Sequence, residues 1–190
     1  MSRLFKAGAA GAVIGLLVGV WGRVFMFVLA DLNPDNHGTD TDDGFPMGTF
    51  TLDGTLNLLV VAVVFGMFGG LLFLAVRGLR VGPTWFRRVT IVLGPSLVVG
   101  SMLVHTDGVD FTVLEPLWLA VAMTLMMPVL FSIGIVWLGD RWLGDGPTFW
   151  QRLPMPAGHV ARAGLAVLAV AAAVSLGSDV ADILDGNPYL

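Results

Sequence analysis

Five long runs of apolar residues constrain the fold of this chain more than any other feature of its sequence. They cover about residues 7–30, 54–76, 89–104, 113–138 and 160–176. A bilayer core about 30 Å thick needs roughly 20 residues of helix to cross it, so each run is near the length of a transmembrane helix. The third and fifth runs are short and the fourth is long, which tilting or an interfacial extension would accommodate. We therefore expect an all-α polytopic membrane protein, with residues 1–190 forming one transmembrane domain of five helices.

The composition argues against a soluble protein. The chain is 56% hydrophobic and only 13% charged, and its mean hydropathy is +0.84, whereas about a quarter of the residues in a soluble domain are charged. Cysteine is absent, which excludes disulfides, thiolate metal ligands and cysteine nucleophiles. The first apolar run is too long for the core of a cleaved signal peptide, so we interpret it as a retained helix.

The basic residues predict an orientation. With five crossings, nine of the ten Lys and Arg residues fall on one side of the membrane, and twelve of the fourteen carboxylates fall on the other. The positive-inside rule then places the N-terminus in the cytoplasm and the C-terminus outside, in the cytoplasmic membrane. An acidic loop at 31–53 and an acidic tail at 178–190 would face outward.

Two connections on the basic side have similar sequences. Gly82-Pro83-Thr84-Trp85-Phe86-Arg87-Arg88 is followed later by Gly146-Pro147-Thr148-Phe149-Trp150-Gln151-Arg152. A duplicated helical hairpin would explain the similarity, and so would the independent use of proline, threonine and aromatic residues at a membrane interface. Thr84 and Thr148 are candidate caps for the helices that follow. We expect anchoring to anionic lipid headgroups at the inner face through Trp85, Arg87, Arg88, Trp150 and Arg152.

Small residues predict close helix packing. The first run contains Gly11, Gly15 and Gly19 at intervals of four, and the second contains Gly66 and Gly70. Glycines at this spacing form one helix face and let another helix approach closely. The partner is either another helix of the same chain or, through the first helix, a second copy of the protein. A larger membrane complex is also a candidate partner.

Arg23 is the most informative single residue. It continues the glycine face by four more positions and lies within an apolar run, where a charge marks a candidate functional site. Its candidate partners are Asp53 and Glu115, with Asn57 one turn from Asp53. Alternatively, Arg23 extends to the outer headgroups. The carboxylates also have a structural interpretation, because Asp53 is a candidate N-cap and Glu115 completes a capping-box spacing.

No motif predicts catalysis. Sequences typical of zinc proteases, nucleophile elbows and phosphate-binding loops are absent. The acidic loop matches no EF-hand, and we predict no metal, no cofactor and no nucleic-acid partner. Pro95 and Pro128 interrupt the third and fourth runs, as in the broken helices of transporters, but no ionisable residue accompanies them.

These patterns favour a non-catalytic membrane subunit that associates with copies of itself or with a larger complex. The alternative is a small channel or transporter that uses the polar residues around Arg23. A lipid-modifying enzyme is a third and weaker hypothesis, which would need His37 and His105 with nearby aspartates at the outer surface.

Overall fold

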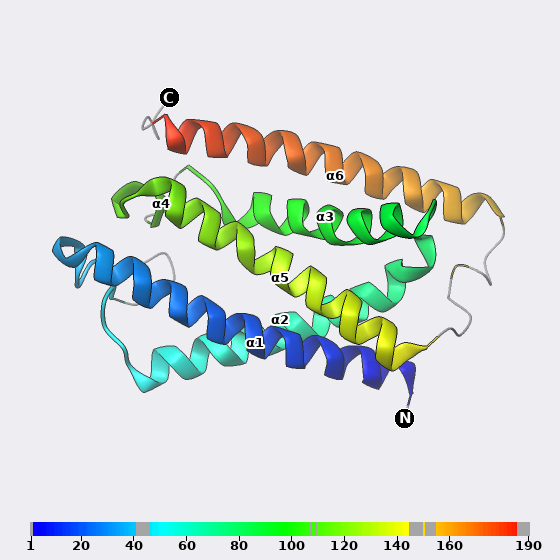
Figure 1. Ribbon diagram of the computed structural model, residues 1–190, viewed down its shortest axis with the longest axis horizontal. Helices are drawn as coiled ribbons and strands as arrows, with labels where there is room; N and C mark the ends of the chain where they lie inside the picture. The colour runs from blue at the N-terminus through cyan, green and yellow to red at the C-terminus, as the bar shows by residue number, and fades with distance from the viewer. Residues whose placement is uncertain are drawn as a thin grey trace.

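The computed structural model describes residues 2–40, 46–106, 108, 110–144, 150 and 155–185, without the side chains of 110, 112, 155 and 156. In this part of the chain, five helices are long and apolar enough to cross a membrane. The helices, with two 3₁₀ turns, are α1 (Arg3–Leu32), η1 (Pro34–Asn36), α2 (Leu52–Val76), η2 (Arg77–Leu79), α3 (Thr84–Leu103), α4 (Asp110–Val113), α5 (Leu117–Leu143) and α6 (Met155–Leu184). The start of α1 and the end of α6 lie at opposite ends of the long axis (Figure 1). That placement fits an odd number of crossings.

The bundle has two ends of different charge, which we name here. The basic end holds the N-terminus, η2, the start of α3, the end of α5 and the start of α6. The acidic end holds η1, the start of α2, α4 and the end of α6. Buried apolar side chains form two clusters, one built around Ile183 and Val104 toward the acidic end and one around Ile14 and Phe73 toward the basic end.

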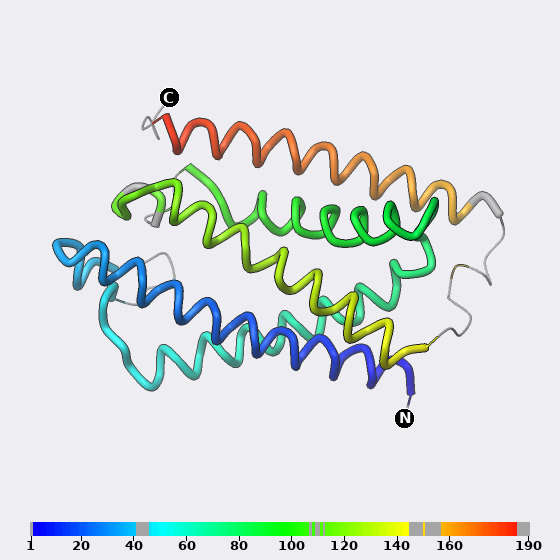
Figure 2. The backbone as a smooth tube through the Cα atoms, in the orientation of Figure 1, coloured from blue at the N-terminus to red at the C-terminus, as the bar shows by residue number. Residues whose placement is uncertain are grey.

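The helices do not pack as two closed hairpins. α2 packs mainly on α1, and α5 crosses the bundle diagonally (Figure 1), contacting both α1 and α3. α3 lies between α5 and α6 rather than against α2, although a short connection joins it to α2 (Figure 2). The hairpin duplication stays a prediction, since the described residues contain only part of its second corner.

The glycines of α1 and α2 bring these two helices into backbone contact. A Cβ at Gly11 would overlap the carbonyl oxygen of Gly66, and one at Gly15 would lie 2.9 Å from the Gly66 Cα. A Cβ at Gly70 would in turn overlap the Ala7 carbonyl oxygen and lie 3.0 Å from the Gly11 Cα. α2 therefore covers the glycine face of α1 within one chain, and association with a second copy would need another surface.

Several helix starts differ from the expectation. Thr51, not Asp53, is the N-cap of α2, because its side chain accepts a hydrogen bond from the Gly54 N–H while Asp53 lies in the first turn. Thr84 is already the first residue of α3, whose N-cap is Pro83. Thr148 lies outside the described residues.

The fourth apolar run is divided into two helices. α4 ends at Val113, and α5 begins only at Leu117, with Pro116 as its N-cap. The residue before a proline avoids the helical conformation, so Glu115 marks the break instead of completing a capping box.

Both intrahelical prolines are tolerated. Pro95 lies inside α3 and Pro128 inside α5, and both helices continue through them, contrary to the expected interruption. Ser96 Oγ donates a hydrogen bond to the Val92 carbonyl (2.7 Å) and contacts the Pro128 carbonyl and Ser132 Oγ, both at 3.2 Å. Membrane helices tolerate proline, and the Ser96 contacts join α3 to α5 beside both prolines.

The outer surface of the bundle is strongly apolar. Phe65 on α2 and Val160 on α6 are each 71% exposed, and similar side chains occur on every long helix. Soluble monomers rarely expose contiguous apolar surface of this extent. The surface is therefore suited to contact lipid.

Candidate functional sites at the two ends

Arg23 meets the start of α2 near the acidic end. Its Nε donates a hydrogen bond to Thr55 Oγ1 at 3.1 Å, and its guanidinium carbon lies 4.5 Å from the centre of the Phe50 ring. Nη1 lies 3.5 Å from the Met26 sulfur, which is a weak acceptor. The guanidinium is thus held by a hydroxyl group and an aromatic face.

None of the predicted partners of Arg23 forms an ion pair or hydrogen bond with it in the described residues. Asp53 and Asn57 are exposed on α2, on either side of Thr55 in the sequence. Glu115 belongs to the break between α4 and α5 and its side chain is exposed. The ion pair that the described residues form is between Arg80 and Asp140, at the opposite end of the bundle. A functional cluster of Arg23 with these residues stays a prediction.

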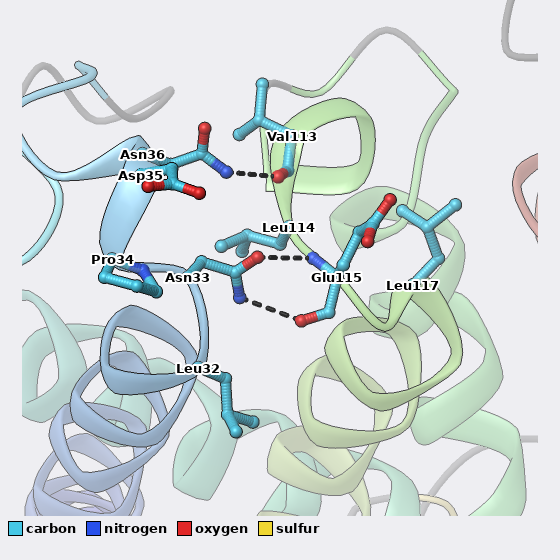
Figure 3. Close-up of a pocket in the computed structure, with 9 residues that line it drawn as sticks. All are labelled: Leu32, Asn33, Pro34, Asp35, Asn36, Val113, Leu114, Glu115 and Leu117. Carbon is cyan, nitrogen blue, oxygen red and sulfur yellow. Dashed lines mark hydrogen bonds between the residues drawn. The ribbon is translucent and has the colours of Figure 1, made fainter.

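Asn33 fastens the end of α1 to the α4–α5 break (Figure 3). Its Oδ1 accepts a hydrogen bond from the Glu115 N–H at 2.8 Å, and its Nδ2 donates to the Glu115 carbonyl at 2.9 Å and to the Leu29 carbonyl at 2.8 Å. Asn36 Nδ2 adds a bond to the Val113 carbonyl at 2.6 Å. Asn33 is only 7% exposed. Its side-chain amide therefore supplies the hydrogen bonds that water would otherwise make with the N–H and carbonyl groups of Glu115.

An open pocket of about 380 Å³ lies beside the hydrogen bonds between Asn33 and Glu115. It is lined by residues 32–36, 113–115 and 117. The carboxylates of Asp35 and Glu115 belong to opposite sides of it (Figure 3). The polar side chains that bridge the two sides, Asn33 and Asn36, are already hydrogen-bonded to the backbone. No group of three or more potential metal ligands occurs among the described residues.

At the basic end, arginines bind the ends of other elements. Arg80 forms a two-pronged ion pair with Asp140 in the last turns of α5, at 2.8 and 2.9 Å. Arg77 Nη2 donates to the Gly144 carbonyl at 2.6 Å, and Arg162 Nε of α6 donates to the Leu79 carbonyl at 3.1 Å. These three arginines therefore connect η2 to α5 and α6.

The predicted interface anchors divide into two groups. Trp85, Arg87 and Arg88 are exposed at the start of α3, where Arg87 Nε also donates to the Gly82 carbonyl at 2.7 Å. Trp150 is partly buried, and its Nε1 donates to the Ala75 carbonyl at 2.6 Å. Arg152 lies outside the described residues. The lipid contacts of these residues stay a prediction.

The sequence interpretation overlooked Asn33, Ser96 and the Arg80–Asp140 pair. Asn33-Pro34-Asp35-Asn36 is a polar turn sequence of the kind that follows a helix end. A capping role for Asn33 could therefore have been predicted from the sequence. The partner of Asn33 lies 82 residues away, however, and no local pattern indicates it.

No protein-family model, curated protein or solved structure matches this chain. The fold alone therefore defines its class. It is an all-helical chain whose described part has five helices long and apolar enough to cross a membrane.

Proposed function

We propose that the chain is an integral protein of the cytoplasmic membrane, with its basic end in the cytoplasm. The apolar outer surface supports insertion, and the collection of arginines at the end that holds the N-terminus supports the orientation. The chain has no cysteine, so single cysteines at Ser2 and at Asp185 would report on the two ends. An impermeant maleimide should label Asp185→Cys in intact cells, and Ser2→Cys only after permeabilisation. Labelling of both positions from the same side would contradict five crossings.

Within the membrane, we propose a non-catalytic subunit that associates with copies of itself or with another membrane protein. The observation that carries this proposal is the surface of α6. A Cβ at Gly164 meets no atom within 4 Å, whereas Gly11, Gly15 and Gly19 of α1 are covered by α2. Residues 166, 167, 170 and 171 form a shallow apolar depression on the same helix. A small residue that no described helix covers offers a surface for close approach by another helix.

Cross-linking in native membranes would test this association. Gly164→Cys should form a disulfide-linked dimer under mild oxidation, or cross-link to a co-purifying protein. Phe65→Cys on the exposed face of α2 is the matched control. Monomers at all protein-to-lipid ratios, with no partner bound in mild detergent, would contradict the proposal.

The second candidate is a small channel or transporter with a polar site at Arg23, Asp53, Asn57 and Glu115. Its support is the arginine inside an apolar run. Against it, α1 and α2 touch through their backbones, and α3 and α5 touch through Ser96 and Ser132, which leaves little room for water between these pairs. Flux through liposomes that is lost in Arg23→Ala, with folding and oligomer size unchanged, would favour transport.

A further inference from the structure

The charge of Arg23 has no acidic partner in the described part of the chain. Arginine stays protonated in proteins, and a charge in an apolar segment needs a counter-charge or water. Asp53 is two residues from Thr55, yet it forms no ion pair with Arg23, and the Glu115 backbone is bound to Asn33. The counter-charge or water that Arg23 needs is therefore to be sought outside these residues.

The position of Arg23 along α1 indicates where that counter-charge lies. At 1.5 Å per residue, Arg23 is about 26 Å from Lys6 and about 30 Å from Arg3, the two basic residues at the other end of α1. This separation matches the roughly 30 Å apolar core of a bilayer. Arg23 also contacts Thr55 in the first turn of α2, where the second apolar helix begins. When Arg3 and Lys6 are in one headgroup layer, Arg23 is in the other.

The contacts of Arg23 leave part of its guanidinium available. Thr55 occupies Nε and the Phe50 ring covers one face, while the terminal nitrogens have only the Met26 sulfur nearby. Two such nitrogens bind the oxygens of a phosphate through parallel hydrogen bonds. Phe27 and Phe50, whose ring centres are 5.5 Å apart, are both about half exposed and flank the site with apolar surface.

We propose that Arg23, oriented by Thr55 and Phe50, binds the phosphate of a lipid in the leaflet at the acidic end. Free anions are disfavoured there, because the surrounding carboxylates give this end a negative potential. Lipid phosphates are held in the plane of the membrane at high local concentration beside the apolar surface of α1 and α2. The site thus rests on the membrane insertion proposed above and adds a specific lipid contact to it.

Solid-state NMR of the full chain in phosphatidylcholine bilayers would test the contact. With arginine side chains labelled with ¹⁵N, the difference between wild type and Arg23→Gln isolates the Arg23 signal. We expect this signal to be dephased by lipid ³¹P, and not by ¹³C-labelled Asp and Glu carboxylates. Dephasing by carboxylates alone, or by neither nucleus, would overturn the proposal.

Two further measurements keep the result interpretable. Should Arg23→Gln fail to fold, Thr55→Val retains the arginine and removes its orienting acceptor, and its ³¹P dephasing at Arg23 should fall at least twofold. Unchanged dephasing in Thr55→Val would contradict the orienting role. The exposed arginines of the basic end serve as the insertion control. If no arginine is dephased by ³¹P, membrane insertion itself fails, whereas loss at Arg23 alone refutes only the lipid site.

Discussion

Arg80 and Asp140, 60 residues apart, pair through both terminal guanidinium nitrogens and both carboxylate oxygens. The guanidinium also lies 5.7 Å from the centre of the Phe73 ring, and its Nε binds the Arg77 carbonyl. Since the two side chains are 19% and 43% exposed, solvent screens the pair in part. The pair fixes the residue after η2 against the end of α5, two elements that the chain order separates widely.

Removing this pair should weaken the basic end modestly. We expect Arg80→Gln and Asp140→Asn each to lower the free energy of unfolding by about 1 kcal/mol, as for a partly exposed ion pair. The double variant should lose less than the sum, because the two changes remove one interaction. Unfolding in bicelles would measure this, with the exposed Arg88→Gln as control. A loss in Arg80→Gln equal to that in the control would contradict the role of the pair.

Enlarging Gly66 should separate α1 from α2. A Cβ at Gly66 would lie 2.8 Å from the Gly15 Cα and would overlap the Gly11 carbonyl oxygen. We expect Gly66→Ala to destabilise the protein by about 1–3 kcal/mol, because backbone atoms on α1 cannot rotate away as a side chain does. Gly8→Ala on α1 is the matched control, since its Cβ would meet no atom within 4 Å. Equal stabilities of the two variants would refute the close approach.

Asn33 should be essential for the join between α1 and α5. Asn33→Leu leaves the N–H and carbonyl groups of Glu115 without their partner, and we expect a loss of about 1–3 kcal/mol. Hydrogen exchange at the Glu115 amide should accelerate in this variant. Asn57→Leu, at an exposed position on α2, should leave stability and exchange unchanged. If the Glu115 amide exchanged as slowly in Asn33→Leu as in the wild type, the hydrogen bonds between Asn33 and Glu115 would be refuted.

The contact between Ser96 and Ser132 should contribute little energy. Both side chains are buried, at 6% and 4% exposure, between α3 and α5. Hydrogen bonds between membrane helices average about 0.6 kcal/mol, so we expect Ser96→Ala to cost about that much. Ser178→Ala, whose hydroxyl binds only the nearby Ser175 carbonyl, is the control. A cost several times larger would indicate a wider polar network at this crossing.

The sequence predicts the helices well and their contacts poorly. Five apolar runs are sufficient to expect five long helices, and the described residues confirm these helices. The runs are apolar on all sides, however, and a helix of that kind carries no face that tells which neighbour it meets. Only the glycines of α1 and α2 carried such information, because a missing side chain marks a close approach.

The candidate sites show the same limit. Arg23 stands out in the sequence because a charge within an apolar run is rare. Its contact with Thr55, and that of Asn33 with Glu115, depend on segments that only the fold brings together. Pro116 was visible as a helix breaker, but the length of the apolar run around it concealed the separation of α4 from α5.

The position of α3 between α5 and α6 sets an order for biogenesis. As a ribosome releases the chain, α1 and α2 can join as soon as both have emerged, since each is the main partner of the other. α3 follows directly but must wait for the last two long helices before its own contacts exist. A nascent chain stalled after Leu103 would contain α1 packed on α2, and an α3 without its packing partners. At this stage we expect an insertase or chaperone to bind α3.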